Sequence, residues 1–281
     1  MTPHQMSAIR LMVCDMDGTI LDSAKRLSSR TLSAIRAAES ERGVATTVCS
    51  GRVCAMMGLY VKKLGLKIPF ISSNGGAIVD PGTDEVLFQM PLPKDEASAL
   101  MDFCGRNGFD YCALGPEGGF FSPFSPDGEC IKRFNRYNLL SEADGVRPMP
   151  LYGIGGASSA VLHKILIFRG DGVTPRVEAF LSGLPGLSYT MSDVTVMDVM
   201  AAGVNKGEGV AHLAKIMGVA REHVCVFGDY TNDLPMFREA GTSVAMGNAC
   251  DEAKAAADFV TASNNDDGVA EFIEKYILNT K

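Results

Sequence analysis

The stretch RLMVCDMDGTILD, Arg10 to Asp22, sets two carboxylates at the end of an apolar run. Residues 9–14 form a short apolar segment of the kind found in strands buried on both faces. Asp15 and Asp17 follow it directly and, being two residues apart, can point to the same side. Gly18 permits a tight turn whose amides can face an anion. Taken alone, however, these residues could form no more than a turn after a strand.

The segments that follow alternate between strand and helix patterns. Strand-like runs at 44–50 and 68–74 alternate with helical patterns at 28–41 and 52–64, and the alternation returns after residue 205. This order predicts an α/β fold with a doubly wound, mostly parallel, Rossmann-like sheet. Glycine and proline cluster between the two blocks, which predicts an inserted second α/β domain. We therefore expect a core of residues 1–81 and 193–281 and an insert of residues 82–192.

Composition excludes several classes of function. The 281 residues are 46% hydrophobic and 21% charged, as in globular proteins, and their net charge of −7 argues against sequence-independent nucleic-acid binding. No apolar run reaches the length of a membrane span, and the first ten residues lack a signal-peptide pattern, so we expect no membrane partner and a cytoplasmic location. The eight scattered cysteines favour reduced, buried thiols, and the four histidines have no zinc-ligand spacing.

Three further segments bring polar groups to the same predicted sheet edge. SGR at 50–52 follows a strand, GVNKGEG at 203–209 begins a helix, and GDYTND at 228–233 follows another strand. Ligands of an open parallel sheet bind beyond the carboxyl ends of its strands, so these groups are expected to meet Asp15 in one crevice. The polar residues that they contribute are Ser50, Gly51, Lys206, Asp229, Asn232 and Asp233.

In this order the four segments resemble the motifs of the haloacid dehalogenase superfamily. DMDGT is similar to its nucleophile motif, SGR to its second motif, Lys206 to its third and GDYTND to its fourth. The insert resembles the α/β cap of the Cof-like sugar-phosphatase branch, and SNGGAIV at 73–79 resembles that branch's Asn-Gly segment beside the phosphate. The resemblance covers nearly the whole chain but does not specify a substrate. Tyr230 is a departure, because the family usually has a small or polar residue there.

The resemblance implies a Mg²⁺-dependent phosphatase that hydrolyses small phosphate monoesters, such as sugar phosphates, through an aspartyl-phosphate. Asp15 is the expected nucleophile, since an ordinary aspartate has a pKa of about 3.9 and is ionised at neutral pH. Asp17 is the expected general acid and base. Like charges about 4 Å apart repel by roughly 4 kcal/mol at an effective dielectric constant of about 20, which a hard cation would offset. The expected Mg²⁺ ligands are Asp15, the backbone carbonyl of Asp17, and Asp229.

The remaining polar residues receive binding and supporting roles. Lys206 is also expected to act in catalysis, by contacting the phosphoryl oxygens. Thr19 is expected to brace the loop, and Asp233 to orient the site from about one helical turn beyond Asp229. The expected phosphate or substrate contacts are Ser50, Gly51, Asn74, Gly75 and Asn232.

Two other functions stay open at this point. A phosphomutase would use the same core but return the phosphoryl group to the product. A non-catalytic metabolite-binding protein ranks last, because no acidic motif residue is lost. The particular substrate and the oligomeric state are not specified by the sequence.

Overall fold

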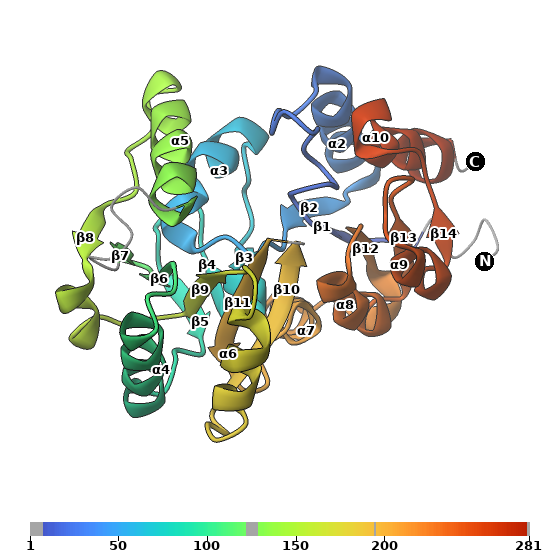
Figure 1. The fold of residues 1–281 in the computed structure, drawn as a ribbon. Coiled ribbons are helices and arrows are strands. Elements are labelled where there is room, and N and C mark those ends of the chain that lie inside the picture. Colours follow the sequence, from blue (N-terminus) through green and yellow to red (C-terminus); the bar gives the residue numbers. More distant parts are fainter. Residues whose placement is uncertain (1–7, 122–128, 194, 280–281) are drawn as a thin grey trace. The chain divides into compact units, whose positions relative to one another are not determined.

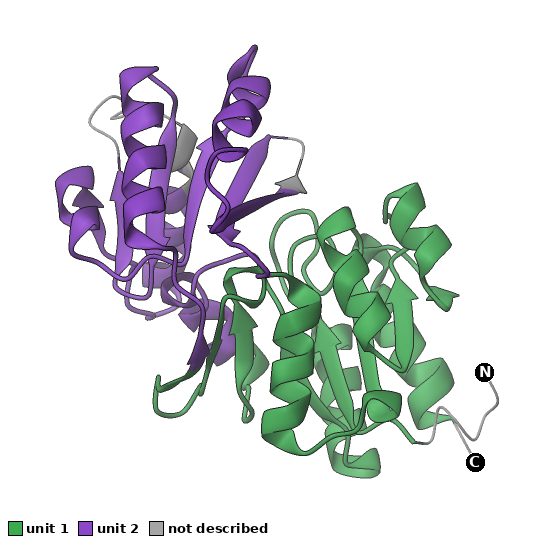
Figure 2. Cartoon of the chain, turned by 90° about the horizontal axis from the view of Figure 1, so that it is seen from below, with its two compact units in different colours: residues 1–50, 63–87, 205–281 green, residues 51–62, 88–204 purple. Residues whose placement is uncertain are grey.

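The computed structural model describes residues 8–121, 129–193 and 195–279, and the chain divides into two compact units. Unit 1 comprises residues 1–50, 63–87 and 205–281, and unit 2 comprises residues 51–62 and 88–204 (Figure 2). Residues 51–62 and 193–204, which the sequence analysis assigns to the core, belong to unit 2 in this division. The assignment of residues 82–192 as a functional cap stays a prediction.

Unit 1 is built on a five-stranded parallel sheet in the order β14-β13-β12-β1-β2. Every residue of strand β1, which lies between β12 and β2, is buried, as its apolar sequence predicts. The chain runs from β1 outward to β2 on one side and later to β12, β13 and β14 on the other. The carboxyl end of β1 is therefore a topological switch point. The strands are β1 (Leu11–Cys14), β2 (Ala45–Val48), β12 (Val224–Gly228), β13 (Thr242–Ala245) and β14 (Phe259–Val260).

Helices cover both faces of this sheet (Figure 1). One layer holds α2 (Ser29–Arg42), α10 (Gly268–Phe272) and the π-helix η7 (Ile273–Leu278), and the other holds α7 (Lys206–Met217), α8 (Leu234–Glu239) and α9 (Asp251–Ala256). Side chains cap the two long helices, since Ser28 accepts from the Thr31 amide and Asn205 accepts from the Glu208 amide. The doubly wound α/β fold predicted from the sequence is confirmed.

Two predictions for the first half of the chain are wrong in detail. The third strand, β3 (Phe70–Ser72), pairs antiparallel with β4 (Ala77–Val79), and β5 (Val86–Gln89) completes a separate three-stranded sheet. One isolated parallel bridge, Cys49–Ile71, links this sheet to the end of β2. The helix predicted at 52–64 starts later, since Val53 is extended, and it is divided into the 3₁₀ turn η1 (Cys54–Met56) and α3 (Gly58–Leu64).

Unit 2 contains a six-stranded sheet in the order β10-β11-β9-β6-β7-β8, in which only the β7–β8 pair is parallel. Its strands are β6 (Tyr111–Gly115), β7 (Gly118–Phe121), β8 (Leu151–Gly153), β9 (Lys164–Phe168), β10 (Leu187–Asp193) and β11 (Val196–Ala201). Its helices are α4 (Lys94–Arg106), α5 (Glu129–Ala143) and α6 (Val173–Leu181). The remaining short helices of the chain are η2 (Ser73–Gly75), η3 (Ile154–Ser158), η4 (Arg221–His223), η5 (Thr231–Asp233) and η6 (Asn264–Asp266).

The core of unit 2 lies between α4, α6 and the sheet. Leu100 of α4 and Val177 of α6 pack with the strand residues Ile165 and Val199, and all four are buried. Phe120 and Phe121 are also buried, whereas Phe124 of the same aromatic segment lies outside the described residues. Among the residues that the structure describes, no helix has the length and apolar character needed to cross a membrane.

Candidate active site

Asp15 stands at the switch point of the unit 1 sheet. Its backbone N–H donates to the carbonyl of Phe227 (2.9 Å), which extends the β1–β12 ladder by one residue beyond β1. The side chain is buried, and its Oδ1 accepts a hydrogen bond from Lys206 Nζ at 2.6 Å. The sheet therefore fixes the position of the predicted nucleophile, and a lysine fixes its carboxylate.

Lys206 is a buried cation between two carboxylates. It is the first residue of α7, and its Nζ lies 2.6 Å from both Asp15 Oδ1 and Asp233 Oδ1. Burial opposes the charged ammonium group, but the charges of Asp15 and Asp233 outweigh it and hold the pKa of Lys206 well above its ordinary value. Lys206 thus stays cationic and can neutralise carboxylate or phosphoryl oxygens.

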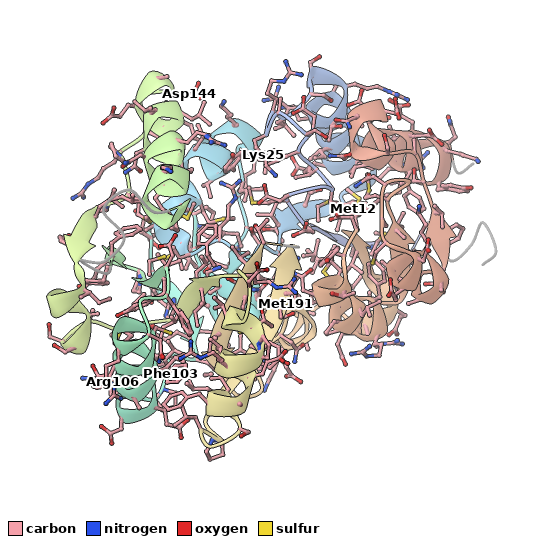
Figure 3. The ribbon with its side chains drawn as sticks, in the orientation of Figure 1. Met12, Lys25, Phe103, Arg106, Asp144 and Met191 are labelled. Carbon is pink, nitrogen blue, oxygen red and sulfur yellow. The ribbon has the colours of Figure 1, made fainter. Side chains whose placement is uncertain are left out.

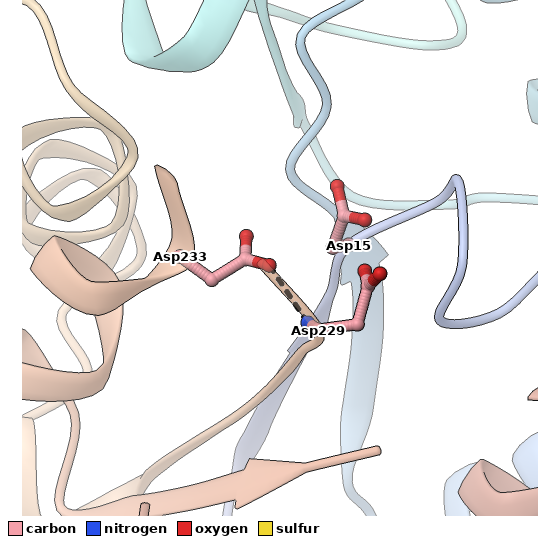
Figure 4. Close-up of side chains that lie close together, drawn as sticks. All are labelled: Asp15, Asp229 and Asp233. Atoms are coloured by element: carbon pink, nitrogen blue, oxygen red, sulfur yellow. Dashed lines mark hydrogen bonds between the residues drawn. The ribbon is translucent and has the colours of Figure 1, made fainter. Parts of the chain in front are cut away.

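Asp233 uses both carboxylate oxygens to organise its surroundings. Its Oδ1 accepts from Lys206, while its Oδ2 accepts from the backbone N–H groups of Asp229 (2.8 Å) and Tyr230 (2.9 Å). Figure 4 shows the three carboxylates of Asp15, Asp229 and Asp233 gathered together, with the bond from the Asp229 amide drawn. Asp233 therefore holds both the ammonium group of Lys206 and the backbone of the turn after β12.

Asp229 faces the loop that follows β1. Its Oδ1 accepts from the hydroxyl of Thr19 (3.1 Å), so Thr19 contacts an acidic residue as well as its own loop. Gly18 has a φ of 92°, and a Cβ atom there would lie 2.3 Å from Asp229 Oδ2. Position 18 therefore requires glycine for two reasons, its backbone conformation and the close approach of a carboxylate.

The acidic groups form a cluster that suits a hard cation. Ligand atoms of Asp15, Asp229 and Asp233 lie within 4.8 Å of one another. Burial, together with the charge of Asp233, raises the pKa of Asp229 to about 6, and burial also raises the pKa of Asp15 although Lys206 opposes this. A divalent cation with oxygen ligands relieves the same desolvation and repulsion, so these residues fit Mg²⁺. Asp15 and Asp229 are the better ligands, because both oxygens of Asp233 already accept hydrogen bonds.

Asp17 differs from the other carboxylates in its surroundings. Its Oδ1 lies 2.7 Å from Nζ of Lys25, and its side chain is 37% exposed. The carboxylate of Asp17 is not a member of the buried acidic cluster. The predicted nucleophile and the predicted acid and base thus have different environments: the first is buried on Lys206, and the second faces solvent beside Lys25.

The predicted phosphate-contact residues divide into two groups. Ser50 is buried, its N–H donates to the carbonyl of Ile71 (3.0 Å), and its own carbonyl accepts from the Asn74 N–H (2.9 Å). The Asn74 side chain accepts from Asn232 Nδ2 (3.2 Å), so these three residues form one connected network in unit 1. Gly51 belongs to unit 2, where its carbonyl accepts from Lys164 Nζ (2.7 Å).

The segment at 73–75 has an uncommon backbone. Ser73, Asn74 and Gly75 all have positive φ angles, of 54°, 55° and 100°. Such angles are strained for residues with a side chain and persist where the surroundings impose them. A Cβ atom at Gly75 would lie 2.1 Å from the carbonyl oxygen of Asn205, which precedes Lys206. This close approach ties the 73–75 segment to the start of α7.

Sequence reasoning missed several residues that support the site. It overlooked Lys25, because the loop from 22 to 28 follows the motif and carries no recognisable pattern of its own. It also overlooked Asn248, whose Nδ2 donates to the carbonyl of Gly18 (2.8 Å). An asparagine just beyond the strand β13, at the same sheet edge, was the available signal.

Comparison with known proteins identifies the family. The profile of the haloacid dehalogenase-like hydrolases matches residues 12–273, which is nearly the whole chain. The chain therefore belongs to the haloacid dehalogenase-like hydrolase family. The sequence-based resemblance and the expectation of a hydrolytic enzyme are both confirmed.

Named relatives share almost the full length of the chain. The 5-amino-6-(5-phospho-D-ribitylamino)uracil phosphatase YwtE of Bacillus subtilis is 28% identical over 96% of this chain and 98% of its own. The pyridoxal phosphate phosphatase YbhA of Escherichia coli is 26% identical over 96% of this chain and 99% of its own. The solved structure of a subclass IIB sugar phosphatase of the superfamily superposes with a TM-score of 0.79 at 26% identity, covering 95% of this chain and 98% of that one.

Proposed function

We propose that this protein is a Mg²⁺-dependent phosphatase that hydrolyses small phosphate monoesters through an aspartyl-phosphate on Asp15. The observation that carries the proposal is the buried Asp15–Lys206–Asp233 arrangement beside Asp229, at the switch point of a parallel sheet. The relatives named above are all phosphatases, which supports the same reaction.

In the first half of the reaction, a carboxylate oxygen of Asp15 attacks the phosphorus atom and the bond to the ester oxygen breaks. Lys206 holds Asp15 in place and offers positive charge to the phosphoryl oxygens, where the charge of the transition state is spread. Asp17 donates a proton to the departing alkoxide, so the product leaves as a neutral alcohol.

In the second half, Asp17 accepts a proton from a water molecule, and the oxygen of that water attacks the phosphorus. The bond between phosphorus and Asp15 breaks, which releases inorganic phosphate and restores the carboxylate. Ser50, Gly51, Asn74, Gly75 and Asn232 are the proposed contacts to the phosphate or to the rest of the substrate.

The proposed Mg²⁺ ligands are Asp15, Asp229 and the backbone carbonyl of Asp17. Thr19 supports this set by donating to the Asp229 carboxylate, and Asp233 supports it by accepting from the Asp229 amide. When bound, the cation would offset the repulsion between these carboxylates and a phosphate dianion.

The proposed substrate class is a small phosphorylated metabolite. The relatives are named as phosphatases of a phosphorylated ribitylamino uracil, of pyridoxal phosphate and of sugar phosphates. These compounds are chemically diverse but share a phosphate monoester. We expect residues outside the acidic cluster to select the particular substrate, because the cluster is proposed to act on the phosphate group that these compounds share. The cytoplasmic location expected from the sequence stays a prediction.

A metabolite screen tests the proposal. Purified protein is incubated with a panel of phosphorylated metabolites, with Mg²⁺ or with a chelator, and free phosphate and isomerised product are both measured. We expect free phosphate only with Mg²⁺, and a loss of about 10³-fold or more for Asp15→Asn. Asp80→Asn is the matched control, because Asp80 is a carboxylate in an exposed turn of unit 1. Isomerised product without free phosphate would indicate a mutase, and substantial activity of Asp15→Asn would refute the nucleophile.

A further inference from the structure

We propose that Lys25 is a positioning residue for Asp17. Its ammonium group holds one carboxylate oxygen of Asp17 and so fixes the orientation of this carboxylate, which donates a proton to the departing alkoxide and later accepts one from water. This inference rests on the proposed function, because it takes Asp17 as the general acid and base. It adds a residue that lies outside the four sequence motifs.

The contact itself is short and lies on the solvent side of the site. Lys25 Nζ is 2.7 Å from Asp17 Oδ1, and the two side chains are 45% and 37% exposed. The carboxylate of Asp15 is instead buried against Lys206. In an in-line displacement the nucleophile and the leaving group lie on opposite sides of the phosphorus atom. Asp17 is more exposed than Asp15, so its carboxylate can reach a leaving group that departs toward solvent.

A hydrogen-bonded turn over residues 22–26 fixes the backbone of Lys25. Lys25 lies on the loop that follows β1 (Figure 3) and has a φ of 61°, which residues with a side chain rarely adopt. Asp22 enforces this conformation, because its Oδ1 accepts from the backbone N–H groups of Ala24 (2.8 Å) and Arg26 (2.9 Å). The Asp22 carbonyl also accepts from the Lys25 N–H (2.9 Å). The turn therefore fixes the backbone from which the Lys25 side chain extends.

Three asparagines fasten the same loop to the loops after β13 and β14. Asn248 donates to the Gly18 carbonyl, and Asn264 donates to the Leu21 carbonyl at 2.9 Å. The Asn265 side chain accepts from the Ser23 N–H and donates to the Ser23 hydroxyl, both at 3.0 Å. Asp17 and Lys25 thus project from a loop that is fixed between them, so their ion pair has a defined geometry.

Leaving-group dependence provides a test that a purely structural role would not meet. Alkoxides need a proton as they depart, whereas nitrophenolate leaves readily without one. We expect Lys25→Met to lower kcat/KM for the best alkyl phosphate of the screen by about tenfold or more, and for p-nitrophenyl phosphate by less than about threefold. Lys25→Arg keeps the charge and should retain kcat/KM within about threefold for both esters. Asp17→Asn should show the same selective loss, and adding Lys25→Met to it should cost nothing further.

Arg26→Met is the matched control for charge. It removes one positive charge from the neighbouring position, where Arg26 pairs with Asp22 instead of Asp17. We expect it to affect the two esters equally. An equal loss for both esters in Lys25→Met, or a result no different from Arg26→Met, would overturn the positioning role. If the wild-type protein hydrolysed no phosphate ester at all, the proposed function would fail first, and this outcome is distinct from the others.

Discussion

The sequence predicts roles for single residues of the site, but it does not specify all of the contacts that these residues make. The sequence predicts Asp15, Lys206 and Asp229 by their type and by their place after strands or at a helix start. The second contact of Lys206, with Asp233, depends on the 3₁₀ turn at 231–233, whose conformation the motif alone does not specify. The positive φ angles of Ser73 and Asn74 are likewise hidden, because they result from long-range packing.

Gly18 gives a prediction at this scale. A methyl group added there would meet the Asp229 carboxylate, which is a proposed Mg²⁺ ligand. We expect Gly18→Ala to raise the Mg²⁺ concentration needed for half-maximal activity by about tenfold or more, since displaced ligand supports typically cost that much affinity. A Mg²⁺ titration of phosphatase activity measures this concentration.

Gly43→Ala is the control for backbone strain alone. Gly43 also has a positive φ, of 66°, but a Cβ atom there would meet nothing within 4 Å. This variant should lose about 1 kcal/mol of stability and keep the wild-type Mg²⁺ dependence. If both alanine variants shifted the Mg²⁺ titration equally, contact with Asp229 would not be the reason.

Helices and strands were predictable where their apolar pattern is regular and their ends are capped. The helix predicted at 28–41 agrees with the bounds of α2 within one residue. The strands β7, β10 and β11 are hidden in the sequence, because glycines or polar residues interrupt them and their stability comes from pairing with distant strands.

The neighbouring strands β9 and β11 carry a buried ion pair. Lys164 Nζ lies 2.8 Å from Asp198 Oδ1, and the two side chains are 5% and 1% exposed. Lys164→Met would leave the Asp198 carboxylate buried without this partner, so we expect a loss of about 3 kcal/mol in the free energy of unfolding. Urea unfolding followed by circular dichroism measures the loss.

A double substitution shows whether the loss of stability comes from leaving one charge buried without its partner. Replacing both residues, as in Lys164→Met with Asp198→Leu, removes both buried charges and should restore at least about half of the lost stability. A double variant no more stable than Lys164→Met would show that the pair itself does not account for the loss.

At the scale of the whole molecule, the acidic cluster of Asp15, Asp229 and Asp233 lies at one switch point of the sheet. The order of strands and helices along the chain predicts this position. The sequence predicts a core interrupted by an insert, which stays a prediction, and the chain divides into two compact units. Their limits were harder to predict, because residues 51–62, which include the last two residues of the second motif, group with unit 2. Packing partners, not local composition, decide such limits.

The acidic cluster makes the stability of the whole protein depend on pH and Mg²⁺ together. Without metal, the pKa of Asp229 is raised from 3.8 to about 6, so the native state binds the proton more tightly than the unfolded chain does. The stability that this group contributes is present below about pH 4 and is lost as the pH rises through about 6. Mg²⁺ binds the ionised carboxylates, so its stabilising effect must grow over the same interval.

We therefore expect Mg²⁺ to raise the melting temperature more at about pH 7.5 than at about pH 5. Thermal unfolding in Mg²⁺ and in chelator at the two pH values measures the difference. Asp229→Asn should remove most of the Mg²⁺ effect at both. An effect of equal size at both pH values in the wild type would contradict Mg²⁺ binding by the titrating cluster.

The most direct measurement of the central claim is a rapid acid quench during turnover of a phosphate ester, followed by peptide mapping with mass spectrometry. The account predicts an acyl phosphate on the peptide that contains Asp15, labile to hydroxylamine and lacking in Asp15→Asn. Active enzyme with no trapped phosphopeptide under single-turnover conditions, or with phosphate on a different residue, would contradict it.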